Sequence, residues 1–276
     1  MLRFMTPLAI AMAAVPATLV AQPGKQQEAP PPPPPPYAWT ADLAVKAPIV
    51  IDATIQDAAK IKGAEAAGVP PGYVRYYLTV NVTALIRAPG ALPAQLGYVY
   101  DAKLDSSGRP PKFKKARVLL FARPVAGMDG QIQLVTPTAQ IAWSPAAEAM
   151  TRSLASAVTA RDAPPAILGI ANAFHAAGVL PGEGETQIFL KTTGHPISLS
   201  VIRKQDQAPV WTVSLTEVVE DALPPPRRDT FLWYRLACGL PRALPAETLS
   251  GLDSSDSVAL QADYALVLAG LGPCRR

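Results

Sequence analysis

The chain has two histidines, and these are the side chains best suited to acid–base or metal chemistry near neutral pH. His195 stands in "TTGHPISLSV", between two runs that alternate apolar and polar residues. We expect Gly194 to supply the positive φ of a tight hairpin, and Pro196 to be the first residue of the next strand. His195 is therefore predicted at an exposed hairpin tip, where a catalytic histidine would lack an orienting partner and shelter from water.

The other histidine, His175, lies near the end of a predicted helix that Pro164 and Pro165 open and Gly178 stops. One face of this helix would carry Ile167, Ile170, Ala171 and Phe174. We expect His175 to help satisfy the last carbonyl groups, where the helix dipole favours a cation.

A metal site could be built from the two histidines together with Glu183 and Glu185, because all four lie around one predicted strand. Their spacing matches no ligand pattern typical of zinc. The sequence therefore predicts no metal site and no cofactor.

Local catalytic signatures are missing from the sequence, which has no Gly-x-Ser-x-Gly, His-Glu-x-x-His, Walker A or Cys-x-x-Cys motif. Paired acids, Asp101 with Asp105 and Glu183 with Glu185, could act as acid and base on a glycoside only across a cleft of defined width. We interpret both pairs as solvated loop residues, and we predict no catalytic residue.

A basic cluster in "GRPPKFKKARV" is the most suggestive feature for binding. Its cations surround one aromatic side chain and accumulate positive potential that attracts anions, while the aromatic could stack or insert. The predicted anion- or partner-binding residues are Arg109, Lys112, Phe113, Lys114, Lys115 and Arg117. The alternative is a solvated loop whose lysines protect neighbouring strand edges.

The two cysteines, Cys238 and Cys274, allow a single internal pairing. In an exported protein this predicts one disulfide, which would tie the C-terminal helix to the helix of "FLWYRLAC". Free thiols and an intermolecular bond are the alternatives.

The first residues indicate export. Arg3 precedes an apolar stretch that ends in small residues near Ala21, the layout of a secretory signal peptide. Residues 1–21 are predicted to be this signal, and residues 22–40, with the unbroken run Pro30–Pro36, a stiff Pro-rich linker. We expect no transmembrane segment after cleavage and a periplasmic or secreted location, although retention of the signal as an anchor is an alternative.

Two predicted domains must hold these candidate residues in place. Residues 41–143 are predicted to form a β-rich domain, a five-stranded antiparallel barrel or sandwich that could be OB-like. Its clearest strand is "YVRYYLTVNVTALI", with period-two alternation; the others are "APIVIDATIQD", "QLGYVYDAKL", "ARVLLFARPV" and "GQIQLVT".

Residues 144–276 are predicted to form an α+β domain with about four helices and a three-stranded antiparallel meander. Ser144 and Pro145 should open the first helix. The meander should consist of "TQIFLKT", "ISLSVIR" and "VWTVSLTEVV", and the last two helices of residues 224–239 and 257–270. We expect the aromatic residues of this domain to lie in the core: Trp211, Phe231, Trp233 and Tyr234.

Together these features predict a non-catalytic binding or scaffolding protein of the bacterial envelope, whose partner is an envelope protein or an anionic envelope component but not nucleic acid. One alternative is a periplasmic hydrolase or isomerase with a cleft between the two domains and a histidine as acid–base. Another is a small-molecule carrier with a pocket lined by tryptophans.

Overall fold

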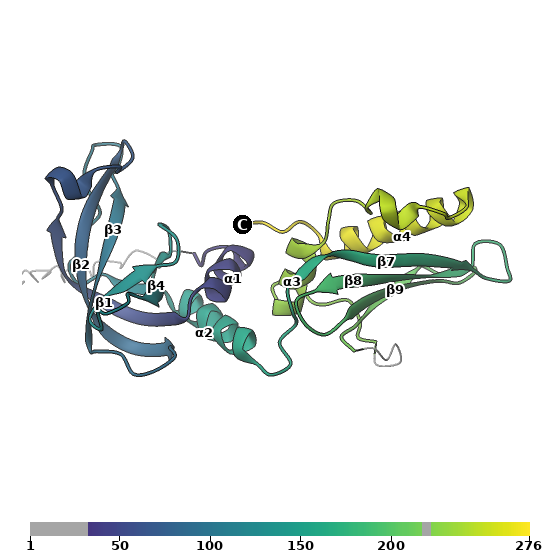
Figure 1. The fold of residues 1–276 in the computed structure, drawn as a ribbon, viewed down its shortest axis with the longest axis horizontal. Helices are drawn as coiled ribbons and strands as arrows, with labels where there is room; N and C mark the ends of the chain where they lie inside the picture. Colours follow the sequence, from purple (N-terminus) through teal and green to yellow (C-terminus); the bar gives the residue numbers. More distant parts are fainter. Residues whose placement is uncertain (1–32, 217–221) are drawn as a thin grey trace, which may run out of the picture. The chain divides into compact units, whose positions relative to one another are not determined.

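The computed structural model describes residues 33–216 and 222–276 of the chain (Figure 1). The predicted signal peptide and the first part of the Pro-rich linker lie outside the described residues. Helix α1 (Tyr37–Lys46) begins directly after Pro36, so residues 37–40, grouped with the linker by composition, form its first turn. Thr40 donates a hydrogen bond from Oγ1 to the Pro36 carbonyl, 3.1 Å away.

The first sheet is antiparallel and contains all five strands predicted for this region. Its strand order is β3-β2-β1-β4-β5, and a sixth short strand, β6, also pairs with β4. The strands are β1 (Ile49–Lys60), β2 (Tyr73–Arg87), β3 (Gln95–Lys103), β4 (Arg117–Pro124), β5 (Ile132–Leu134) and β6 (Gln140–Ala142). A short 3-10 helix (Gly63–Ala66) precedes β2.

The sheet curls but does not close into a barrel, so the closed form of the prediction is wrong. β3 and β5 meet only at a single parallel bridge between Gly97 and Gln131. A Cβ on Gly97 would lie 1.8 Å from the Tyr77 hydroxyl, so any other residue here would displace the Tyr77 side chain that crosses over it. Beyond this bridge the two strands form no ladder, although their residues remain close to one another.

Alternation along β2 places the core of this sheet as the period-two pattern predicts. Tyr76, Leu78 and Val80 are buried, whereas Arg75 and Thr79 on the opposite face are partly exposed. The buried side joins residues of β1, β3 and β4 in a core cluster inside the curled sheet.

Helix α2 (Pro145–Thr159) begins as predicted. Ser144 accepts a hydrogen bond at Oγ from the Ala147 N–H, 3.2 Å away, and Pro145 occupies the first turn. The helix contributes Leu154 to a second core cluster, which also contains residues of α1, β4 and the second sheet.

The second sheet is antiparallel with four strands, one more than predicted, in the order β10-β9-β8-β7. Its strands are β7 (Ile167–Ala177), β8 (Gly184–Thr192), β9 (Ile197–Arg203) and β10 (Val210–Ser214). The helix predicted from residue 164 to 178 is wrong, because this segment is β7. Two register shifts, one at residues 167–169 and one at 170–172, interrupt its alternation.

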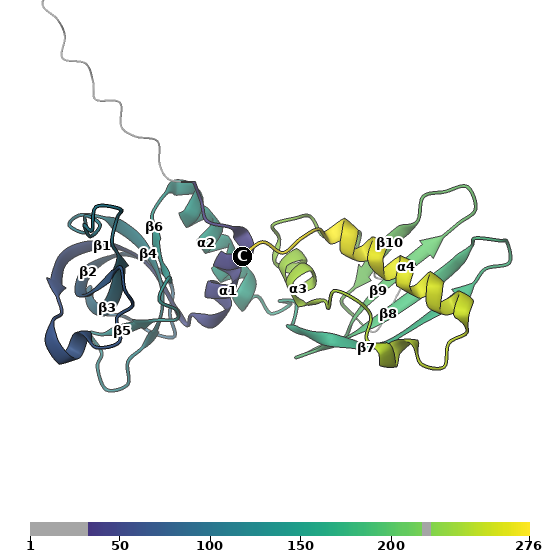
Figure 2. The ribbon, with the colours of Figure 1, turned by 90° about the horizontal axis from the view of Figure 1, so that it is seen from above.

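Helices α3 (Phe231–Gly239) and α4 (Ser254–Leu271) lie on one face of the second sheet, with a short 3-10 helix (Ala246–Leu249) between them (Figure 2). Trp211 of β10 and three residues of α3, Phe231, Trp233 and Tyr234, are all buried as predicted. These aromatic rings are part of the core, and Tyr234 also borders a shallow pocket beside Cys238 and Arg276. In the described part of the chain, no helix is long and apolar enough to cross a membrane.

Candidate functional site

The basic cluster lies in the loop between β3 and β4, except for Arg117, which is the first residue of β4, and a buried ring anchors the loop. Phe113 is 8% exposed and packs against Tyr76 and Tyr100, with ring centroids 5.0 and 6.3 Å apart. The aromatic ring is therefore part of the core and is unavailable to stack on a ligand.

Backbone hydrogen bonds fix the second half of this loop against β1. The Lys115 N–H donates to the Ile55 carbonyl at 2.9 Å, and the Ala116 N–H donates to the Phe113 carbonyl at 2.8 Å. Lys115 itself has a φ of 65°. Its side chain and those of Lys112 and Lys114 are exposed, and none of the three makes an ion pair with a residue that the structure describes.

The two arginines of the cluster have partners. Arg109 is exposed and bonds from Nε to Asp105 Oδ2 at 3.2 Å. Asp105 also accepts the backbone N–H groups of Arg109 and Ser107, and these hydrogen bonds lower the pKa of its carboxyl group. The Asp105 carboxylate thus partly neutralises the first cation of the loop.

Arg117 belongs to a network that joins β1, β4 and α2. Its Nε donates to Asp52 Oδ1 at 2.9 Å, and its NH2 group lies 3.5 Å from Glu148 Oε2. The guanidinium also lies 3.8 Å from the centre of the Trp143 ring. Trp143 Nε1 donates to Glu148 Oε2 at 2.8 Å, and this hydrogen bond, followed by that from Arg152, lowers the pKa of the Glu148 carboxyl. The charge of Arg117 is therefore paired with carboxylates inside the fold, those of Asp52 and Glu148.

His195 is exposed in the β8–β9 turn, as expected, although the turn is built differently. Gly194 does not have a positive φ, contrary to the prediction. Instead, Thr192 Oγ1 contacts the carbonyls of Gly194 and His195, 3.1 and 2.8 Å away, and accepts the Gly194 N–H. The turn therefore needs the Thr192 hydroxyl where the prediction relied on glycine.

His175 is not at a helix end, as predicted, but on β7, where its side chain is 7% exposed. Its Nδ1 lies 2.9 Å from Thr186 Oγ1, and that hydroxyl donates to Asp263 Oδ2 at 2.5 Å. Arg203 donates from Nε to Asp263 Oδ1 at 2.5 Å. Because the Thr186 proton goes to Asp263, its oxygen accepts from the imidazole, and we assign the Nδ1–H tautomer.

This buried polar cluster ties α4 to the sheet. Asp263 has no exposed surface, so its charge needs the partners that β8 and β9 provide. Gly184 leaves room for the imidazole, since a Cβ there would lie 2.6 Å from His175 Cε1. A chain of this kind resembles a proton relay, although Asp263 is fully buried and the His175 side chain is only 7% exposed.

The acidic pairs and the possible metal ligands are dispersed. Asp101 bonds to Arg75 across β3 and β2 at 2.7 Å, which lowers the Asp101 pKa. Glu183 Oε1 accepts the Gln205 N–H at 3.3 Å, and Glu185 accepts from Gln187. Among the described residues, no three His, Cys, Asp or Glu side chains gather in a position to hold a metal.

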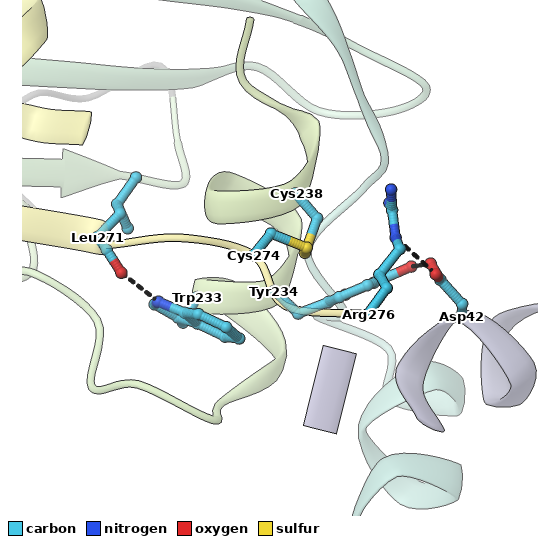
Figure 3. The surroundings of a disulfide bond; sticks show 7 residues. All are labelled: Asp42, Trp233, Tyr234, Cys238, Leu271, Cys274 and Arg276. Atoms are coloured by element: carbon cyan, nitrogen blue, oxygen red, sulfur yellow. Dashed lines mark hydrogen bonds and ion pairs between the residues drawn. A yellow bond between two sulfur atoms is a disulfide. The ribbon is translucent and has the colours of Figure 1, made fainter. Parts of the chain in front are cut away.

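The predicted disulfide is confirmed. Cys238, near the end of α3, bonds to Cys274, which follows α4; their Cα atoms are 5.2 Å apart (Figure 3). Two further contacts hold the same region, as Trp233 Nε1 donates to the Leu271 carbonyl at 2.7 Å and Arg276 pairs with Asp42 at 2.7 Å.

A groove that the sequence did not reveal lies between β3 and β5, beyond the bridge where they touch. Its volume is about 500 Å³, and its walls include Tyr98, Tyr100, Ile132 and Leu134. The guanidinium of Arg123 lies at this groove and donates to Gln133 Oε1 at 3.1 and 2.9 Å. No local motif could have indicated it, because the walls come from strands about thirty residues apart.

No protein-family model matches this chain, and a search of curated proteins found no significant similarity.

Proposed function

We propose that this protein is an exported, non-catalytic binding or scaffolding protein of the bacterial envelope, which holds an anionic partner through the β3–β4 loop. The observation that supports this best is the exposure of Lys112, Lys114 and Lys115 on a loop whose backbone is anchored. Their side chains need little reordering of the main chain to meet an anionic surface, which limits the entropy cost of binding.

The proposed location is the periplasm or the outside of the cell. The Cys238–Cys274 disulfide is consistent with an oxidising compartment, as is the signal-like N-terminal sequence. The anionic partner available in an envelope is a lipid headgroup surface, and an acidic envelope protein is the other candidate. Nucleic acid is not proposed as a partner.

We also propose an OB-like arrangement for the first sheet. β1 pairs with both β2 and β4, while β3 and β5 approach each other at the open side. A partly open five-stranded sheet of this kind is a common platform for extended ligands.

Neither alternative function gains support from a specific contact. An acid–base role for His175 requires substrate access to an enclosed imidazole, and His195 lies on an exposed turn with no orienting partner among the described residues. A carrier pocket lined by Trp211 or Trp233 would have to form where these rings are packed in the core.

Charge reversal tests the proposal. The triple variant Lys112→Glu, Lys114→Glu, Lys115→Glu should lose at least about tenfold in its partition onto phosphatidylglycerol vesicles at low salt, since each lysine contributes about 1 kcal/mol near such a surface. The matched control reverses three exposed lysines elsewhere, Lys60, Lys191 and Lys204. Equal losses in both variants, or equal retention, would reject the loop as the binding site.

A zwitterionic vesicle and a salt series complete the experiment. Retention of the wild-type protein should vanish on phosphatidylcholine and fall with ionic strength, because the attraction is screened. If vesicles are not bound but an acidic envelope protein is captured through the same lysines, the partner is that protein and not the lipid.

A further inference from the structure

Helix α3 carries an arginine that has no carboxylate partner among the described residues. Arg235 is partly buried, its Nε donates to the Pro164 carbonyl at 3.0 Å, and its guanidinium lies 4.7 Å from the centre of the Phe231 ring. Its NH1 and NH2 groups make no hydrogen bond or ion pair with a described residue. Burial lowers the pKa of Arg235, because the cation loses solvent and gains no counter-ion. An anion bound beside it would supply that counter-ion.

Arg235 borders the shallow pocket between the start of β7 and α3. The pocket has a volume of about 170 Å³. Ala166, Ile167 and Cys238 form an apolar part of its wall, and Arg235 and Arg276 are its cations. Pockets that enclose a whole small molecule have roughly 300–1,000 Å³, so this one has room for an end group only.

The sequence of α3 places the arginine over this pocket. Arg235, Cys238 and Gly239 are three and four residues apart, and so they share one side of the helix. A Cβ on Gly239 would lie 2.9 Å from the Ile167 Cβ, which means that α3 and β7 approach each other closely here. The guanidinium is therefore held next to an apolar surface that β7 provides.

Arg276 brings a second guanidinium to the same pocket (Figure 3). It pairs with Asp42 Oδ2 at 2.7 Å, and Asp42 Oδ1 accepts the Tyr234 hydroxyl at 2.7 Å. Burial and this hydrogen bond raise the pKa of Tyr234, whereas the charges of Arg235 and Arg276 both oppose the rise, so both act near the same hydroxyl. One carboxylate thus accompanies two cations, and both of its oxygen atoms already have partners.

The type of cation indicates the type of anion. Residues 222–276 contain six arginines and no lysine. A guanidinium is a planar fork that binds a carboxylate through two parallel hydrogen bonds, which an ammonium group cannot do. The apolar wall suits a ligand with a small side chain next to its charged group, as at the end of a peptide, and an inorganic phosphate has no such side chain.

From this arrangement we infer that the pocket beside Cys238 binds the carboxylate end of a peptide whose last side chain is small and apolar. Arg235 donates to the carboxylate from its NH1 and NH2 groups, Arg276 adds a second positive charge, and the last side chain of the peptide lies against Ile167. The pocket shares no residue with the basic β3–β4 loop, so this inference is independent of the anionic partner proposed above.

A dipeptide with and without its charge tests the inference on the wild-type protein. The probes are N-acetyl-alanyl-alanine as the free acid and the matched amide. In amide NMR spectra, the free acid should cause saturable shifts at Ile167, Cys238 and Gly239. The amide should bind at least about tenfold more weakly, because it cannot make the charge-assisted hydrogen bonds. Equal shifts with acid and amide, or no saturable shift, would overturn the inference.

Variants locate the binding. Arg235→Gln should bind the free acid at least about fivefold more weakly, whereas Arg242→Gln, which removes an exposed arginine outside this pocket, should bind it as the wild type does. Equal losses in both variants would attribute the binding to overall charge and reject the pocket. If inorganic phosphate shifts the same amides and the dipeptide does not, the pocket binds phosphate and the carboxylate assignment is wrong.

The triple variant Lys112→Glu, Lys114→Glu, Lys115→Glu separates this site from the β3–β4 loop. It should bind the free acid as the wild type does, even though it is expected to lose its attraction to anionic vesicles. Failure of the loop therefore leaves the pocket intact, and failure of the pocket leaves the loop intact. Loss of dipeptide binding in the triple variant would overturn the inference.

Discussion

Arg117 of β4 neutralises the carboxylate of Asp52 on β1, which has no exposed surface, while its guanidinium lies over the Trp143 ring. This relationship removes Arg117 from the basic surface and makes it a structural residue. Replacing Arg117 without replacing Asp52 should lower the free energy of unfolding, because a buried charge without its partner is strongly destabilising.

Replacement of Arg117 should therefore lower the free energy of unfolding. Arg117→Met leaves Asp52 unpaired, and we expect a loss of about 3 kcal/mol in urea titrations followed by tryptophan fluorescence. The double variant Arg117→Met, Asp52→Asn should recover part of it. Arg109→Met, at an exposed pair, should change the stability by less than about 0.5 kcal/mol. Similar losses at Arg109 and Arg117 would contradict this assignment.

Glu148 should contribute to loss of stability in acid. Hydrogen bonds from Trp143 and Arg152 lower its pKa in the folded protein, so its stabilising effect is present above the unfolded pKa of about 4.3 and is lost as the pH falls through the folded value. Glu148→Gln should flatten the fall in unfolding free energy below this pH, and Trp143→Phe, which removes one donor, should flatten it partly. If the unfolding free energy of Glu148→Gln fell with pH in parallel with that of the wild type, the hydrogen bonds to Glu148 would not contribute to the pH dependence of stability.

Loss of the disulfide should destabilise the protein by about 4 kcal/mol or less, the value expected from the chain entropy of a loop of 36 residues. The comparison is between the wild type and Cys238→Ser, Cys274→Ser in urea. Intact mass should show the wild type lighter than its reduced form by the mass of two hydrogen atoms. A wild-type mass equal to that of the reduced form would exclude the bond in solution.

The two histidines should differ in their effect on stability. His175→Ala breaks the hydrogen bond to Thr186 in a buried cluster, and a decrease of about 1–2 kcal/mol in the unfolding free energy is expected. His195→Ala, on an exposed turn, should stay within about 0.5 kcal/mol of the wild type. Gly184→Ala should resemble His175→Ala, because the added methyl group displaces the imidazole. If His175→Ala were neutral, the imidazole would not be part of the packed cluster.

The sequence predicted strands best where alternation was regular. β2 keeps its period over the residues that pair with β3, and its inward face was identified correctly. In β7, two register shifts place Ile167, Ile170 and Ala173 against the core at intervals of three. That spacing imitates a helix, which explains the wrong prediction for residues 164–178.

Candidate sites were harder to predict because their parts are distant in the sequence. The buried cluster takes one residue from each of β7, β8, β9 and α4, and its only local signal is Asp263, a charged residue between Leu260 and Val267 on the inward face of a helix. The basic loop was found as a run of charges, but the roles of Phe113 and Arg117 depend on rings and acids that other strands provide.

Asp42 of α1 accepts hydrogen bonds from Tyr234, 192 residues away, and from Arg276. A chain that emerges N-terminus first during synthesis can assemble β1 to β4 before its end is made, but the polar contacts of its first helix wait for its last residues. The order of folding is thereby set by topology: hairpins form early, and α1 completes its contacts only when the Cys274 segment arrives. The contacts that complete α1 therefore form only after the last residues of the chain have been made.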